Sequence, residues 1–387
     1  MRTVLKWLAR ICVALFLAAL VVGIWKREQI SRLLAVNSLF AQDRIVANFS
    51  NMGAAFLTRP VPRGDGPVSA LPQGPEMTVP PEIQNWIANR AVTSLIVLKD
   101  GAIVHESYYQ GTTPGDLRIS WSMAKSYVSA LFGTLLTDGT IASLDDPVIK
   151  YAPALAGGAY GDATIRNVLN MASGVVFDED YLDSKSDINR MGRVLALGGT
   201  MDNFAARLSD TFAAPGTQWK YVSIDTHIAG MVIRGATGRD VPSLLSERII
   251  APLGLEQTPY YLTDGVGVAF VLGGLNMTTR DYARFGLMYA QNGRYGDVQV
   301  VPADWVAAST RPSAPTAPGR IGYGFQWWIP AGSDPGVFMA RGIYGQYIYI
   351  DQTRGVVIVT TAADRAFRDP GVDDRNIAMF RTIAGSL

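Results

Sequence analysis

A serine and a lysine one helical turn apart, Ser122 and Lys125, are the residues of this chain best suited to covalent catalysis. Apolar residues follow them at helical spacing, so both should lie at the start of a helix and on one face of it. A neutral Lys125 could accept the Ser122 proton, provided that burial lowers its pKa from the ordinary value of ~10.4. The free N–H of Ser122 could form half of an oxyanion hole.

The S-x-x-K pattern alone is a weak signal, because so short a pattern also arises by chance. The alternative is a helix-capping serine followed by a lysine in solvent. The apolar sequence around Lys125 argues against a lysine in solvent, so a nucleophile and its base remain the better interpretation.

A tyrosine and a glycine-rich turn could complete such a site. Tyr221 lies in a loop ahead of a helix predicted from Asp225, where its hydroxyl could relay a proton. On this segment alone, a tyrosine that packs its ring at a domain edge is the better interpretation. The glycines of residues 341–346 lead into a strand, and a strand N–H there could complete the oxyanion hole. An ordinary glycine turn is the alternative.

The scarcity of histidine and cysteine excludes several other kinds of site. The chain has two histidines, His105 and His227, and one cysteine, Cys12, which lies in an apolar N-terminal run. They cannot assemble a Cys/His metal cluster, and no catalytic cysteine is left. A Ser-His-Asp hydrolase is rejected because no G-x-S-x-G motif occurs. We therefore predict no metal and no cofactor, and we interpret both histidines as structural.

Composition indicates a large globular chain without a nucleic-acid partner. Of 387 residues, 48% are hydrophobic, which is enough for a sizeable core. Lys and Arg number 34 against 33 Asp and Glu, and no block of like charge suggests nucleic acid. The sequence does not specify an oligomeric state.

Local patterns predict an α/β (α+β) fold: an antiparallel sheet flanked by N- and C-terminal helices, with an all-helical lobe inserted. The predicted strands are 94–98, 102–109, 324–328, 346–350 and 356–361. The predicted helices are 82–90, 122–137, 165–171, 191–197, 225–234, 241–249 and 373–384. We predict an α/β lobe from residues 86–138 and 271–387, a helical lobe from 139–270, and a Pro/Gly-rich linker over 41–85.

The N-terminus predicts a membrane anchor. Basic residues flank an uninterrupted apolar run over residues 11–25, and no A-x-A-like cleavage site follows closely. We therefore expect residues 1–40 to form an anchor and its flank. The expected location is the inner (cytoplasmic) membrane, single-pass, with the N-terminus inside and the catalytic part facing the periplasm. Export by a cleaved signal peptide is the alternative.

Together with further motifs, these pieces resemble a known family. The motifs are W-S-M-A-K-S at 121–126, F-D-E-D-Y at 177–181, G-L-N-M-T-T-R-D at 274–281, Y-G-F-Q-W-W at 323–328 and G-Q-Y-I-Y-I-D at 345–351. From about residue 85 onward, the chain is similar to the serine β-lactamase and penicillin-recognising family, in its class C branch. The 6-aminohexanoate-dimer hydrolases and family VIII esterases are the most similar subgroup.

The resemblance implies roles for individual residues. Ser122 would be the nucleophile, Lys125 the general base and Tyr221 the proton relay. The N–H groups of Ser122 and Ile343 would form the oxyanion hole, and Tyr181 would line the substrate pocket. Tyr344, where some relatives carry His or Gly, is a further candidate for substrate binding.

Two departures affect the expected substrate. The Lys-Thr-Gly motif of true β-lactamases is replaced by Ala340-Arg341-Gly342, and the usual Tyr-x-Asn is replaced by Tyr221-Val222-Ser223. Both changes leave the acyl-transfer groups in place and argue against β-lactam turnover. The sequence thus predicts a serine hydrolase of small esters or amides. The alternatives are a D-Ala-D-Ala carboxypeptidase or β-lactamase, and a non-catalytic membrane-anchored protein with a penicillin-binding fold.

Overall fold

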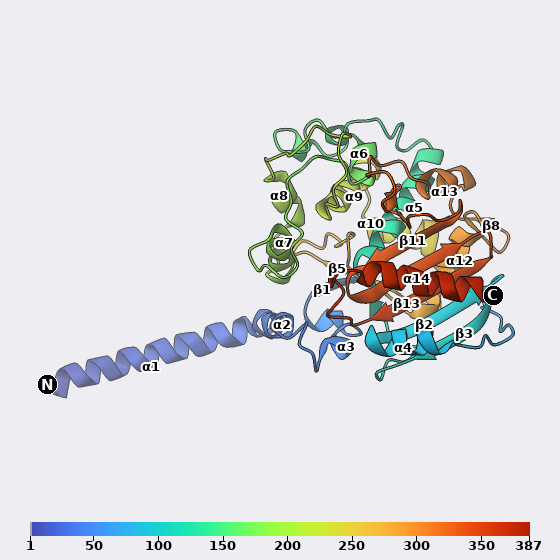
Figure 1. The fold of residues 1–387 in the computed structure, drawn as a ribbon. Coiled ribbons are helices and arrows are strands. Elements are labelled where there is room, and N and C mark those ends of the chain that lie inside the picture. Colours follow the sequence, from blue (N-terminus) through green and yellow to red (C-terminus); the bar gives the residue numbers. More distant parts are fainter. Residues whose placement is uncertain (1) are drawn as a thin grey trace.

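Strands from both ends of the catalytic region meet in one antiparallel sheet. The computed structural model describes residues 2–387 (Figure 1). In it, β2 (Val92–Lys99) and β3 (Ala102–Tyr108) form the predicted hairpin, with Asp100 and Gly101 at its turn. The late strands β12 (Gln346–Asp351) and β13 (Val356–Ala362) pair with each other, and β13 also pairs with β2. The sheet therefore joins segments far apart in sequence.

Three further strands extend the sheet beyond β12, and all three differ from the prediction. The order is β3-β2-β13-β12-β11-β10-β9, with β11 at Val337–Gly342, which was not predicted. The single strand predicted at 324–328 is wrong: β9 (Gly322–Tyr323) and β10 (Trp328–Ile329) pair with each other across a turn. Gln326 there has φ +65°, and a side chain at position 324 would lie 2.1 Å from the Ser309 carbonyl oxygen. Such a turn needs a glycine and cannot continue as a strand.

Helices cover both faces of this sheet. Successive strand residues point to opposite faces, so Val97 and Ile358 pack on one side, against α4 (Pro81–Asn89) and α14 (Val372–Gly385). Figure 1 shows α14 lying across the sheet. On the other side, α12 (Thr279–Ala290) packs closely through Gly286, which lies against Ile348 and Val357. The predicted fold class is confirmed.

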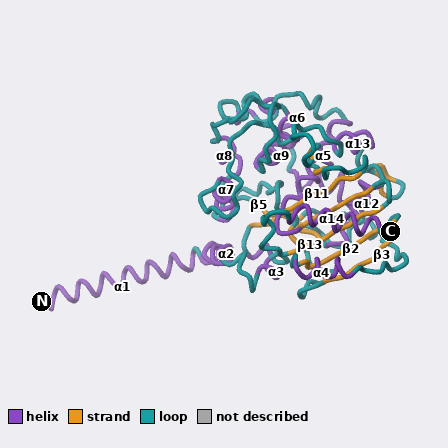
Figure 2. The backbone as a smooth tube through the Cα atoms, viewed as in Figure 1, coloured by secondary structure: helices purple, strands orange, loops and turns teal. Residues whose placement is uncertain are grey.

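Most of the helical elements lie between the hairpin and the late strands. Figure 2 shows this region as short helices joined by long loops. The α-helices are α5 (Ala124–Thr137), α6 (Ile165–Leu169), α7 (Asp187–Ala196), α8 (Met201–Ala206), α9 (Ile224–Thr237), α10 (Val241–Leu245) and α11 (Ala251–Leu253), with a π-helical turn at Ser246–Ile250. Later in the chain come α13 (Ala303–Ser309) and the short hairpin of β7 (Arg294–Tyr295) and β8 (Val298–Gln299). The division into two lobes stays a prediction.

A second, four-stranded sheet was not predicted. Its order is β1-β5-β6-β4, built from Leu57–Pro60, Tyr260–Thr263, Leu275–Met277 and Arg118–Ile119. The short helix α3 (Ile45–Asn48) and the 3₁₀ turn Met52–Ala54 precede it, and Phe49, Met52 and Val61 are fully buried. The first part of the predicted linker is therefore packed into the core rather than lying loosely over a surface.

The N-terminal helix α1 (Arg2–Trp25) extends away from the rest of the protein (Figure 1). Its length and composition are sufficient to cross a membrane, and none of its residues is buried. A signal sequence has the same properties, so α1 indicates an anchor or an export signal. One residue, Lys26, separates it from α2 (Arg27–Asn37). Beyond α2, Leu39 is buried, and the Asn48 side chain donates hydrogen bonds to the Ser38 and Leu39 carbonyl oxygens.

This packing predicts where the N-terminus can be cut. Deleting residues 2–26 should give a soluble protein with an unchanged free energy of unfolding, because α1 buries no side chain. Deleting residues 2–40 also removes Leu39 and Phe40, and should lower that free energy by about 2 kcal/mol or more. Urea denaturation of the two proteins tests this. Equal stabilities would show that the segment after α2 does not support the fold.

Candidate active site

The site begins at a sharp turn that leads into α5. Ser122 is the middle residue of the 3₁₀ turn Trp121–Met123 (η2), directly after β4, and it is half-buried. Trp121 has φ +42°, a left-handed conformation that a non-glycine residue adopts only under constraint. The first N–H groups of such a turn have no partner within it, so the Ser122 N–H is free to face a ligand.

Lys125 lies one turn further and is almost completely buried, with 1% of its surface exposed. Its Nζ donates a 2.7 Å hydrogen bond to the Leu272 carbonyl oxygen. Burial lowers the pKa of this amine to about 7, although the carboxylates of Glu179 and Asp225 act in the opposite direction. A large fraction of Lys125 is therefore neutral near pH 7, as a general base must be.

Tyr221 approaches the same place from the loop ahead of α9. Its ring lies 5.5 Å from Lys125 Nζ and stacks on Trp328 with the ring centroids 5.1 Å apart. Burial raises the pKa of its phenol, and its contact with the Ser122 hydroxyl acts in the opposite direction. Tyr221 is therefore a neutral proton donor at ordinary pH. The ring packing considered as the alternative and a hydroxyl directed to Ser122 occur together.

The end of β11 approaches the Ser122 turn closely. A Cβ on Gly342 would lie 2.5 Å from the Ser120 carbonyl oxygen and 3.1 Å from the Ser122 nitrogen, so only glycine fits. The next residue, Ile343, begins a 3₁₀ turn (Ile343–Gly345) and has no partner for its N–H within that turn. This approach brings the Ile343 backbone to the same cleft as Ser122.

A half-buried carboxylate, Glu179, lies in the F-D-E-D-Y motif, and its role was not predicted from the sequence. Its side chain accepts hydrogen bonds from the Ser223 N–H, from the Ser223 hydroxyl at 3.1 Å and from the Tyr181 hydroxyl at 2.8 Å. Burial raises its pKa, and nearby Lys125 acts in the opposite direction. Glu179 thus fixes Tyr181 and the loop carrying Tyr221. Because Asp178 and Asp180 flank it, its sequence context offered no signal of burial.

Two cavities meet at Ser122, and Tyr181 and Ile343 line both of them. The polar arm, of about 400 Å³, is also lined by Glu179, Tyr221, Trp328, Arg341, Gly342, Gly345, Tyr347, Phe367, Arg368 and Asp373. The apolar arm, of about 320 Å³, is lined mainly by aliphatic and aromatic side chains and includes Tyr344. Of the predicted site residues, Ser122, Tyr181, Tyr221, Ile343 and Tyr344 therefore line one cleft. Lys125 is buried beside Tyr221.

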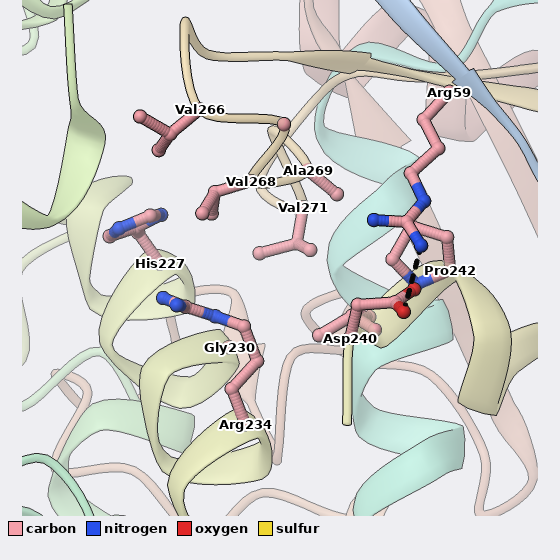
Figure 3. A pocket seen from close by; sticks show the side chains of 12 residues that line it. Arg59, His227, Gly230, Arg234, Asp240, Pro242, Val266, Val268, Ala269 and Val271 are labelled. Atoms are coloured by element: carbon pink, nitrogen blue, oxygen red, sulfur yellow. Dashed lines mark hydrogen bonds and ion pairs between the residues drawn. The ribbon is translucent and has the colours of Figure 1, made fainter. Parts of the chain in front are cut away.

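Neither histidine lines the cleft at Ser122. Among the described residues, a third cavity, of about 190 Å³, shares no lining residue with either arm and contains His227 (Figure 3). His227 and Arg234 both bind Asp202, at 2.8 and 2.7 Å, and Arg59 pairs with Asp240 at 2.9 Å. These charges are already neutralised. Within residues 2–387, no group of three or more His, Cys, Asp or Glu residues could hold a metal ion.

The burial of Lys125 predicts the pH dependence of acylation. The amine is protonated below its pKa and can accept a proton only above it, so the rate should rise with pH and level off above about 7. Measuring kcat/KM for a small ester between about pH 5 and about pH 9 tests this. Lys150→Ala, which removes an exposed lysine, should keep the profile. A rate independent of pH over this range would contradict a lysine base.

Comparisons with known proteins found a matching family model and several similar proteins. Residues 83–380 match the family model described as Beta-lactamase. The 6-aminohexanoate-dimer hydrolase of Paenarthrobacter ureafaciens is 27% identical over 331 residues, which cover 80% of this chain and 83% of that protein. The D-alanyl-D-alanine-carboxypeptidase/endopeptidase AmpH of Escherichia coli K12 is 28% identical over 178 residues, 43% of this chain and 44% of its own.

Solved structures show the same fold. A structure from Bacillus anthracis, provisionally named a 6-aminohexanoate-dimer hydrolase, has a TM-score of 0.80 at 24% identity and covers 89% of this chain and 95% of its own. A family VIII carboxylesterase has a TM-score of 0.60 at 19% identity, over 81% of this chain and 99% of its own.

Proposed function

Because the chain belongs to the beta-lactamase family, we propose that it hydrolyses small esters or linear amides through an acyl intermediate on Ser122. The family membership confirms the resemblance found in the motifs, and the named relatives make the chain a hydrolytic enzyme. The observation that carries the proposal is the buried Lys125 amine, whose lowered pKa provides a base next to a serine.

Acylation follows from the positions of the site groups. Neutral Lys125 accepts the Ser122 proton while Oγ attacks the substrate carbonyl carbon. The negative charge that develops on the carbonyl oxygen is stabilised by the N–H groups of Ser122 and Ile343. Tyr221 donates its proton to the leaving oxygen or nitrogen and is reprotonated from Lys125, so that the proton taken from the serine leaves with the alcohol or amine. Tyr181 lines the cleft where the substrate binds.

Deacylation uses the same groups in reverse order. Lys125, neutral again, accepts a proton through Tyr221 from a water molecule that attacks the acyl carbon. The oxyanion is held as before, and Ser122 regains its proton when the carboxylic acid leaves. No step needs a metal or a cofactor, since each proton transfer uses a side chain of this chain.

Two observations favour esters and linear amides over β-lactams. Ala340 stands at the lysine position of the missing Lys-Thr-Gly motif, and Arg341, at the threonine position, forms an ion pair with Asp373 and lies 5.0 Å from the Trp328 ring. The Asp373 carboxylate therefore already neutralises the Arg341 guanidinium. Ser223, at the place of the missing asparagine, donates its hydroxyl to Glu179. Neither residue is free to bind the carboxylate or the acylamino group of a β-lactam. A binding protein without turnover would have no need of a lowered lysine pKa.

We also propose that α1 anchors the enzyme in the inner membrane, with the cleft on the periplasmic side. The length, apolarity and lack of burial of α1 support this, and so do its basic flanks. Cleavage of α1 as a signal peptide is the alternative, and N-terminal sequencing of the mature protein distinguishes the two.

Loss of the Ser122 hydroxyl should abolish activity. Ser122→Ala should lower kcat for p-nitrophenyl butyrate by at least about a thousandfold and abolish fluorophosphonate labelling, because no acyl enzyme can form. Ser129→Ala is the matched control, since it removes a buried hydroxyl from α5, the helix that follows the Ser122 turn, outside the cleft. Fluorophosphonate labelling that persists in the Ser122 variant would disprove the assignment.

The preference for esters over β-lactams should follow from Arg341 and Ser223, whose polar groups are already bonded to Asp373 and Glu179. A β-lactam loses two polar contacts, each worth about 1–3 kcal/mol, whereas a short ester needs neither. We therefore expect kcat/KM for p-nitrophenyl butyrate to exceed that for a chromogenic cephalosporin by at least about a hundredfold. A preference for the cephalosporin would instead support the β-lactamase alternative.

A further inference from the structure

The apolar arm has the composition of a hydrocarbon-binding pocket. It starts at Ser122 and runs between three parts of the chain. Its aliphatic and aromatic lining comes mainly from the segment around the end of α2 (Val36, Leu39 and Phe40), from α7 (Ile188, Met191 and Leu195) and from β5 and the loop after it (Leu262, Phe270 and Leu272). Its volume of about 320 Å³ is within the range of small-molecule sites. An aliphatic chain would bury apolar surface along the whole arm.

The two arms divide the substrate at the scissile bond. Tyr221, the proposed donor to the leaving group, lines the polar arm and not the apolar arm. The leaving oxygen or nitrogen must lie next to the Tyr221 hydroxyl, so the leaving group occupies the polar arm. The acyl part lies on the other side of the carbonyl carbon and points into the apolar arm.

The position of the apolar arm relative to α1 adds a second observation. Its wall includes the end of α2, which follows the apolar helix α1 after a single residue. Leu182, which also lines the arm, is 81% exposed, so an apolar side chain stands at its rim. An arm with apolar walls next to a helix suited to a bilayer fits a substrate that partitions into membranes.

We infer that the apolar arm binds the aliphatic acyl chain of an amphiphilic, lipid-like ester or amide. This inference rests on the proposed function and names the substrate class for the same site. The head group of such a substrate would leave through the polar arm, where Arg368 and the Arg341–Asp373 pair provide polar contacts.

The test uses the full-length protein in phosphatidylcholine vesicles and p-nitrophenyl esters from acetate to octanoate. The wild-type kcat/KM should rise with chain length, by up to about fourfold for each methylene group that the arm buries. Ile188→Trp narrows the arm and should lower the octanoate-to-acetate ratio by at least about tenfold. Arg190→Trp places the same ring on the same helix outside the arm and should keep the wild-type ratio.

A second variant guards against misfolding of the first. Gly192 also lines the arm, and a Cβ there meets no atom within 4 Å, so Gly192→Phe should fold and lower the ratio in the same direction. Because all variants share the same vesicles, ester partitioning cancels in the comparison.

The possible results separate this inference from the proposed function. Hydrolysis that needs Ser122 but does not depend on chain length would overturn the inference and leave the proposed function standing. A ratio that responds equally to Ile188→Trp and Arg190→Trp would also overturn it. If neither these esters nor the corresponding p-nitroanilides are hydrolysed, the proposed function fails, and the inference fails with it.

Discussion

The site depends on keeping one amine out of water. A lysine whose pKa falls from 10.5 to about 7 on burial costs the folded state on the order of 5 kcal/mol wherever the amine is charged in the unfolded chain. This cost is full below pH ~7 and disappears as the pH rises toward 10.5, because the unfolded chain then loses the same proton. The surrounding core must offset it. The apolar helix α5 and the Leu272 carbonyl oxygen, which accepts a hydrogen bond in either protonation state, make the burial possible.

Aromatic packing stabilises the strained backbone on both sides of the cleft, at Trp121 and at Tyr344. Trp121 and Tyr344 both have positive φ, a conformation that costs about 1–3 kcal/mol at a non-glycine residue. Phe40 stacks on both rings, with centroids 6.0 Å from Trp121 and 5.2 Å from Tyr344, and the Trp121 and Tyr344 rings lie 6.2 Å from each other. Phe49 packs edge-on against both rings. The N-terminal segment is therefore part of what holds in position the two turns that carry Ser122 and Ile343.

Features with a local period could be predicted from the sequence. The β2–β3 hairpin, α5 and the Ser122–Lys125 pair follow from alternation, turn residues and helical spacing within a few residues. The family resemblance favoured the catalytic interpretation of Tyr221 and the 341–346 turn over their alternatives, and it added Tyr181. The four-stranded sheet was missed because its strands have two to four residues and find their partners far away in sequence. Strand β11 and the turn between β9 and β10 both contain apolar residues, so local composition does not show which segment is a strand. The pairing with neighbouring strands decides it.

The structural role of Glu179 and the division of the cleft into two arms could not be predicted either, because both depend on residues far apart in the chain. Glu179 gains its importance from Ser223, 44 residues later, and from a cleft that forms only when distant segments assemble. A carboxylate in an acidic stretch of sequence looks like a solvated one until its partners are known. The apolar arm is likewise built from three segments, none of which is unusual alone.

The short connection between α1 and α2 has a mechanical consequence. A long flexible linker would let a tethered enzyme search a large volume, with a low effective concentration of its site at any one distance. Here a single residue, Lys26, separates α1 from an 11-residue helix that is fastened to the core by Leu39 and Asn48. At 1.5 Å per residue, α2 spans roughly 16 Å. A surface that held α1 would therefore also hold the cleft at a nearly constant height, and would confine the site to a thin layer rather than a volume.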